Sequence, residues 1–117
     1  MDPCDDQDAV FRALAHAHRR RILDLLRRMP GASVNDLCKY FDTSRIAVMK
    51  HLSVLVEAGL VHSEKHGRTR SLHFDPVPLR RIHDRWTDEL GEFWAGRMLD
   101  VKRRVEARAT RARERTP

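Results

Sequence analysis

The chain has 117 residues, of which 41% are hydrophobic and 34% are charged, and its formal net charge is +6 at pH 7. This length supports one domain with one modest core, and the composition is that of a globular chain rather than a disordered one. No apolar run approaches the roughly 20 residues that span a bilayer. The acidic N-terminus lacks the basic start of a signal peptide, so we expect a cytoplasmic location.

The basic balance favours a polyanionic partner, chiefly nucleic acid or an anionic membrane surface, although it could also serve solubility alone. The two cysteines, Cys4 and Cys38, do not make a disulfide framework. No Ser/His/Asp arrangement, carboxylate pair or glycine-rich phosphate motif stands out. The sequence therefore predicts neither an enzyme nor a cofactor.

Apolar residues recur at helical spacing over residues 9–17 and again over residues 18–29, which predicts two helices with a break between them. Pro30 and Gly31 end the second helix. Ser33 and Asp36 have the spacing of a capping box, with Asp in place of the usual Glu, and predict the start of a short helix.

A longer helix is predicted over residues 44–58, with Thr43 or Ser44 as its N-cap and Gly59 as its C-terminal stop. A short helix, a tight turn and a longer helix in this order predict a helix-turn-helix. Segments 60–66 and 70–74 are predicted as two strands of a hairpin, with Leu72 and Phe74 alternating inward in the second. A hairpin directly after a helix-turn-helix is a wing.

From Leu79 an apolar stripe at helical spacing continues to Val105, which predicts one long last helix. After Val105 the stripe stops, so we expect a frayed or disordered end. The expected organisation is an acidic N-terminal arm over residues 1–8, a domain over 9–105, and a basic, flexible tail over 106–117.

Four consecutive strings, ALAHAHRRRILDLL, VNDLCKYF, SRIAVMKHLSVLVEAGLV and GRTRSLHFDP, make the chain resemble the ArsR/SmtB family of bacterial winged-helix repressors over about residues 9–100. The resemblance implies a mostly helical winged helix-turn-helix with about five helices and a two-stranded wing. It also implies a homodimer that binds double-stranded operator DNA and represses transcription. In many members of that family an inducer, often a metal ion, releases the DNA; the sequence specifies no inducer here.

In a helix-turn-helix the second helix enters the major groove, here helix 44–58, with the wing at 61–74 on the DNA backbone or minor groove. On a helical wheel Val48, Leu52 and Leu55 form the core stripe. The residues that we expect to contact DNA are Ser44, Arg45, Ile46, Met49, Lys50, His51, Arg68 and Arg70.

Different chemistry is expected of each side chain on this helix. Arg45 suits the edge of a guanine, while Ser44 and Lys50 suit phosphates. Ile46 and Met49 lie off the core stripe and suit thymine methyl groups. The alternative is that both pack beneath the wing or on a neighbouring helix. The family usually has small or polar residues, or proline, at these two places.

His51 matches the histidine of the family's KHL string, and either a phosphate contact or a scaffold contact is expected. Arg68 and Arg70 flank the tight turn of the wing, which suits phosphate or minor-groove contact, with a solvated tip as the alternative. The basic run 19–21 either touches the DNA backbone from the side or is solvated.

The last helix is expected to form the dimer interface, because its apolar stripe exceeds what a small monomer covers. The resemblance adds the first helix to this surface. The expected interface residues are Phe11, Leu14, Trp86, Leu90, Phe93 and Trp94. The alternative is that both helices belong to a monomer core.

No metal site is expected, because the positions aligned with the family's CxC motif are Ser33 and Asn35, and the last helix offers only the adjacent pair His83 and Asp84. Two alternatives remain. One is a metal- or thiol-responsive repressor of the same family that uses Cys4 and Cys38, with a histidine such as His16. The other is a winged helix that binds proteins.

Overall fold

The computed structural model describes the backbone of residues 3–115 and the side chains of residues 6–115. It consists of two compact units, Met1–Arg81 and Ile82–Pro117, which we describe separately. None of the helices in the described part of the chain is both long enough and apolar enough to cross a membrane. The elements are α1 (Pro3–Leu14), α2 (Ala17–Arg28), α3 (Val34–Cys38), α4 (Arg45–Glu57), β1 (Val61–His66), β2 (Thr69–Phe74), α5 (Val77–Trp86) and α6 (Glu89–Glu114).

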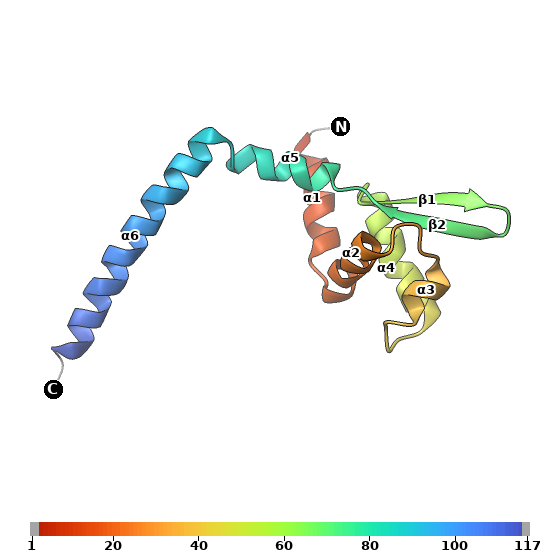
Figure 1. Cartoon of the computed structure of the whole chain (residues 1–117), viewed down its shortest axis with the longest axis horizontal. Coiled ribbons are helices and arrows are strands. Elements are labelled where there is room, and N and C mark those ends of the chain that lie inside the picture. The colour runs from red at the N-terminus through yellow and green to blue at the C-terminus, as the bar shows by residue number, and fades with distance from the viewer. Residues whose placement is uncertain (1–2, 116–117) are drawn as a thin grey trace. The chain divides into compact units, whose positions relative to one another are not determined.

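The core of the first unit lies among α1, α2, α4 and the base of the β1–β2 hairpin (Figure 1). Helix α4 buries the three residues of its predicted stripe, Val48, Leu52 and Leu55. Helix α3 inserts Leu37, and the chain leaving α4 adds Leu60 and Val61, all three of them fully enclosed. The predicted helix-turn-helix is therefore confirmed as α3 and α4.

The helix starts follow the predicted capping chemistry. The Ser33 hydroxyl accepts the Asp36 amide at 3.2 Å, and the Asp36 carboxylate accepts the Ser33 amide at 3.0 Å, which completes the capping box of α3. Of the two predicted caps for α4, Ser44 is the N-cap, because its hydroxyl accepts the Ala47 amide. At Gly59 the backbone has φ of 77°, a left-handed conformation that favours glycine after a helix.

The wing is an antiparallel pair in which Val61 lies opposite Phe74 and His66 lies opposite Thr69. Leu72 is its buried anchor, and it also forms an isolated bridge with Ala32, which the sequence did not indicate. At the base of the wing, Nε2 of His62 lies 2.7 Å from the carboxylate of Asp75. The bridge to Ala32 joins the wing to the segment between α2 and α3.

The prediction of one uninterrupted last helix was wrong. Helix α5 ends at Trp86, and a second helix, α6, begins at Glu89. Asp88 is the N-cap of α6, since its carboxylate accepts the Gly91 amide at 2.8 Å. A Cβ at Gly91 would collide with the Trp86 carbonyl, so glycine permits this close turn. The helical spacing of apolar residues continues across the break, so this spacing did not indicate where α5 ends.

The chain after Val105 also differs from its prediction, because α6 remains helical to Glu114. Residues 106–114 are mostly alanine, arginine and glutamate, which have high helix propensity and need no apolar stripe to extend a helix. Lys102 and Glu106, one turn apart, add an ion pair at 3.9 Å. At the other end of the chain, the backbone of the expected acidic arm is helical from Pro3.

Candidate nucleic-acid interface

The N-terminal half of α4 exposes both polar and apolar side chains to solvent. Ser44, Arg45 and Lys50 are exposed. Ile46 and Met49 are exposed as well, with 68% and 48% of their surface accessible. The buried stripe of the same helix holds it to the domain, so these five side chains are available to a partner.

Arg45 is held in place by the neighbouring helix of the motif. Its guanidinium donates a hydrogen bond to Oδ1 of Asn35, which lies in α3. A guanidinium carries five N–H groups, so most remain available for a second partner. Asn35 thus orients Arg45 without using up its donors.

Met49 and Ile46 differ in their surroundings. Met49 borders a hollow of about 500 Å³ between α4 and the wing, whose other walls include Val56, Arg70 and Leu72. Ile46 is not part of that hollow. The alternative of packing beneath the wing therefore applies in part to Met49 and not to Ile46, which is the more exposed of the two.

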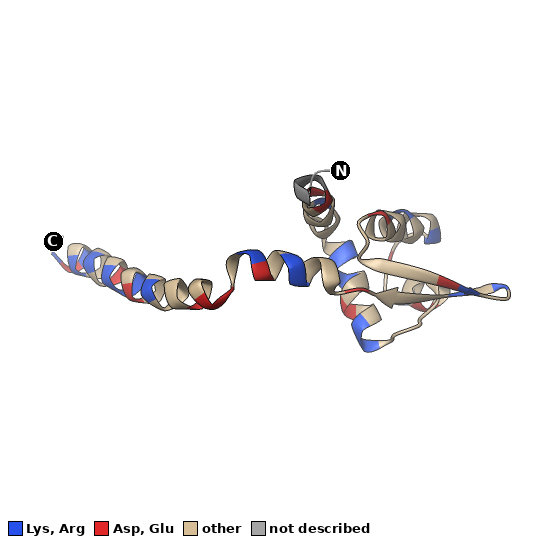
Figure 2. Ribbon diagram, turned by 90° about the horizontal axis from the view of Figure 1, so that it is seen from above, with Lys and Arg blue, Asp and Glu red and all other residues tan. Residues whose placement is uncertain are grey.

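Figure 2 shows basic residues toward the tip of the wing. Lys65 lies opposite Arg70 in the strand register, and Arg68 is in the two-residue turn. The nearby carboxylate of Glu64 lies 3.4 Å from Nε2 of His66 and 3.9 Å from Nε2 of His73. The far end of the wing is basic, because Lys65, Arg68 and Arg70 are all exposed.

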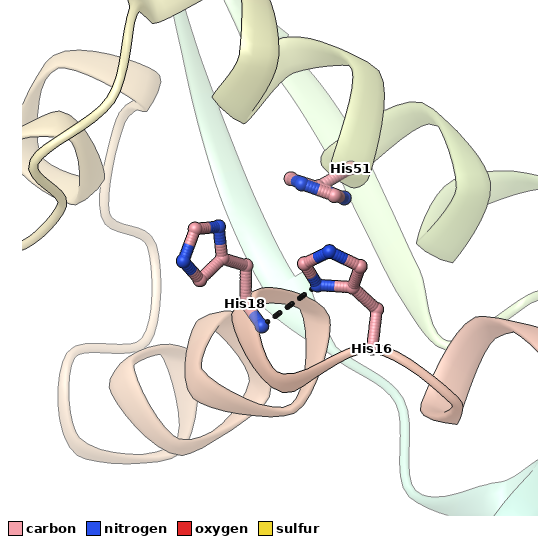
Figure 3. A group of neighbouring side chains, drawn as sticks. All are labelled: His16, His18 and His51. Carbon is pink, nitrogen blue, oxygen red and sulfur yellow. Dashed lines mark hydrogen bonds between the residues drawn. The ribbon is translucent and has the colours of Figure 1, made fainter.

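His51 belongs to a histidine cluster with His16 and His18, on the side of α4 that faces α2 (Figure 3). Its ring centroid lies 4.3 Å from that of His16 and 5.5 Å from that of His18. All three residues are half-buried. His51 therefore makes scaffold contacts within the chain, and its phosphate contact stays a prediction.

The predicted basic run also has a structural role. Nε of Arg19 donates to the Ala13 carbonyl at 2.7 Å, and Arg20 donates to the Leu14 carbonyl at 2.7 Å. These carbonyls are at the end of α1, where a helix leaves its last acceptors unpaired. Arg21 instead stacks over the ring of Phe41 at 5.7 Å.

Burial lowers the pKa of His51, and the nearby His16, Arg19 and His18 lower it further. Desolvation, followed by Arg19, likewise lowers the pKa of His16. Both causes disfavour the charged imidazolium. The neutral form of both rings is therefore favoured, and a neutral imidazole keeps one nitrogen lone pair. Sequence reasoning grouped His16 with the cysteines and missed this cluster, because its members come together only in the tertiary fold.

The residues expected at a dimer interface remain uncovered within one chain. Phe11, Trp86, Leu90, Phe93 and Trp94 are exposed, and Leu14 is half-buried. Neither α5 nor α6 contains a buried residue over its described length. Of the two cysteines, Cys38 is half-buried in α3, while the side chain of Cys4 lies outside the described residues.

A helix-turn-helix followed by a basic hairpin, with an exposed N-terminal half of the second helix, defines the chain as a winged-helix DNA-binding protein. A family model described as a helix-turn-helix domain matches residues 14–64. An HTH-type transcriptional regulator of Bacillus subtilis, YuzN, is 38% identical over 89 residues, which cover 71% of this chain and 97% of the relative.

Two further matches are a curated operon repressor and a solved structure of an ArsR family regulator. The arsenical resistance operon repressor of Escherichia coli is 28% identical over 103 residues, which are 88% of this chain and 77% of the relative. The crystal structure of an ArsR family regulator has a TM-score of 0.68 and 32% identity, and the match covers 80% of this chain and 95% of that one. The chain belongs to the ArsR family of winged helix-turn-helix proteins and is a DNA-binding transcriptional regulator.

Proposed function

We propose that the protein is a homodimeric transcriptional repressor that inserts the N-terminal half of α4 into the major groove of its operator. The observation that carries this proposal is the division of α4 into two sides. Val48, Leu52 and Leu55 are buried. The first two turns expose Arg45 and Lys50 together with Ile46 and Met49. A helix held firmly by one side can present the other to base edges.

Each exposed side chain then has a separate role in binding. Arg45, oriented by Asn35, reads a guanine through paired hydrogen bonds. Ser44 and Lys50 bind phosphates, and Arg68 and Arg70 of the wing bind the backbone or the minor groove. Ile46 and Met49 contact thymine methyl groups. His51 supports the helix from its inner side.

Dimerisation supplies the second half of the binding site. On α6 the exposed residues Leu90, Trp94, Met98, Val101 and Val105 recur at intervals of three or four, which places them along one stripe. A contiguous apolar stripe of this size favours a protein partner. A second copy, paired through the same stripe, places two α4 helices on two half-sites.

Repression is the simplest outcome of such binding, because a dimer that occupies a promoter blocks access to it. The Escherichia coli relative is named as an operon repressor. A promoter–reporter assay with and without the protein distinguishes repression from activation.

The binding role of α4 is tested with Arg45→Ala and Lys50→Ala, using as probe a fragment selected by the wild-type protein from genomic DNA. Loss of a base contact of this kind costs about 1–3 kcal/mol, so we expect Arg45→Ala to weaken binding roughly 5- to 150-fold. Lys50→Ala should weaken binding to all sequences and reduce the salt slope by about one.

Lys102→Ala is the matched control, because Lys102 is an exposed cation of α6 that no step of the binding model uses. It should bind like the wild type. If Arg45→Ala and Lys50→Ala are folded dimers with unchanged mobility-shift affinity, α4 does not read DNA and the proposal is wrong.

A further inference from the structure

His16 and His18, two positions apart at the start of α2, meet His51 of α4 at one point. His16 is the N-cap of α2, His18 lies in the first turn of α2, and His51 lies in the middle of α4. One nitrogen from each ring can be chosen so that all three lie within 4.8 Å of one another (Figure 3).

We propose that this histidine cluster binds one divalent transition-metal ion and thereby links the α1–α2 junction to α4. Imidazole nitrogens are preferred ligands of Zn²⁺, Ni²⁺, Cu²⁺ and related ions, whereas Mg²⁺ and Ca²⁺ prefer oxygen. Three histidines with a water in the fourth position form a familiar tetrahedral set. The site uses no thiolate, so it is separate from any role of Cys4 or Cys38.

The geometry requires only a local adjustment. Metal–nitrogen distances of about 2.0–2.1 Å place tetrahedral ligand nitrogens about 3.3 Å apart. The rings must therefore approach one another by up to about 1.5 Å from their present separation. Each ring is half-buried rather than enclosed, and rotation about its side-chain bonds can supply such a shift.

Metal binding competes with two hydrogen bonds that the cluster now makes. Nδ1 of His16 accepts the His18 amide at 3.0 Å, and Nδ1 of His51 lies 3.3 Å from the guanidinium of Arg19. A neutral imidazole that binds a metal through one nitrogen carries its proton on the other, so it has no lone pair left to accept a hydrogen bond. A bound ion therefore breaks both hydrogen bonds, and the His18 amide loses its acceptor at the N-cap of α2.

The charges around the cluster affect how readily it binds a cation. Arg19 and Arg20 disfavour a cation, but both guanidiniums are engaged with carbonyl oxygens at the end of α1. Desolvation lowers the pKa of His16 and of His51, which favours the neutral imidazole that a metal ion binds. Selectivity then favours ions that bind nitrogen strongly over those that act mainly by charge.

The test is titration of the whole 117-residue chain with Co²⁺ and Zn²⁺ in the absence of DNA. We expect one equivalent of Co²⁺ to bind and to develop the visible absorption of a tetrahedral complex, and Zn²⁺ to displace it. The backbone amide signal of His18 should shift at the same stoichiometry, because it loses its acceptor. Because no DNA is present, the result is independent of the mobility-shift experiment.

The variants His16→Asn, His18→Gln and His51→Gln each remove one ligand. Asn keeps a capping oxygen at position 16, and Gln at position 51 keeps an acceptor for Arg19. Each variant should bind the metal roughly 100-fold more weakly or worse, since even the outer partners of metal ligands are worth 10–100-fold. His83→Gln, which changes an exposed histidine of α5, should bind like the wild type.

Wild-type binding weaker than about 100 µM, or undiminished binding in the three cluster variants, overturns the proposal. Equal loss in His83→Gln overturns it as well, because the ion then binds elsewhere. His18→Gln keeps the test decisive if another variant unfolds, since the His18 ring packs against other rings and makes no hydrogen bond among the described residues.

Discussion

The guanidinium of Arg19 lies 3.3 Å from Nδ1 of His51 and also donates to the carbonyls of Arg12 and Ala13. One side chain at the start of α2 thus joins the end of α1 to the middle of α4. This contact positions the helix that carries the DNA-binding residues, although Arg19 itself lies outside that set.

Replacing Arg19 with methionine should destabilise the fold, because it removes the donors while keeping an unbranched apolar chain. Two α1 carbonyls and His51 lose a charged partner, and we expect a loss of about 1–3 kcal/mol in the free energy of unfolding. Urea denaturation measures the change. Arg28→Met, at the exposed end of α2, is the control and should change little. Equal effects of the two substitutions would show that Arg19 acts only through its charge.

Ile46→Ala and Met49→Ala should relax a preference for thymine at the base positions that these residues face, because alanine offers a smaller apolar surface to the methyl group. Selection of bound sequences from a random pool measures this change. Stability should shift by less than about 0.5 kcal/mol, since both side chains are exposed.

Val48→Ala is the contrasting variant on the same helix. Val48 is buried, so its truncation should reduce stability, by roughly 1–3 kcal/mol, and leave base preference unchanged. If Ile46→Ala or Met49→Ala behaves like Val48→Ala, that side chain belongs to the core and not to the DNA-binding surface.

The Asp75 carboxylate should make the base of the wing sensitive to acid. The hydrogen bond with His62, followed by the Val77 amide, lowers the pKa of Asp75. Ionised Asp75 therefore favours the folded state, and this contribution is fully present above the pKa of the unfolded chain, about 3.9. It is lost as the pH falls through the lower, folded-state pKa.

Asp75→Asn removes this dependence while keeping the shape of the side chain. The variant should be less stable than the wild type at pH 6, and the difference should shrink as the pH falls below about 4. Unfolding by urea across this range measures both curves. A difference that stays constant down to pH 2 would mean that the charge of Asp75 has no part in stability.

Trp94→Glu should dissociate the homodimer, because a carboxylate in a buried apolar interface has no partner there. Trp94 is half exposed within one chain, so the monomer should keep its fold. Sedimentation at micromolar concentration measures the assembly. Ala107→Glu introduces the same charge on the other side of α6 and should remain dimeric. A dimeric Trp94→Glu protein would place the interface elsewhere.

Local sequence signals predicted much of the fold. Ser33 with Asp36 predicted the start of α3, and the stripe through Val48 and Leu52 predicted the buried side of α4. Both depend on neighbours within one or two turns of helix. The break before α6 was not predicted, because the spacing of the apolar stripe continues across it and only the cap at Asp88 marks the new helix start.

The sequence by itself determined the order of elements through the wing, the starts of α3 and α4, and the exposure of Ile46 and Lys50, because periodicity and capping act over a few residues. Only the tertiary structure decided that His16, His18 and His51 converge and that Arg19 bonds to α1 carbonyls. His51 follows His16 by 35 positions, and no local pattern reports which side chains meet when α2 packs against α4.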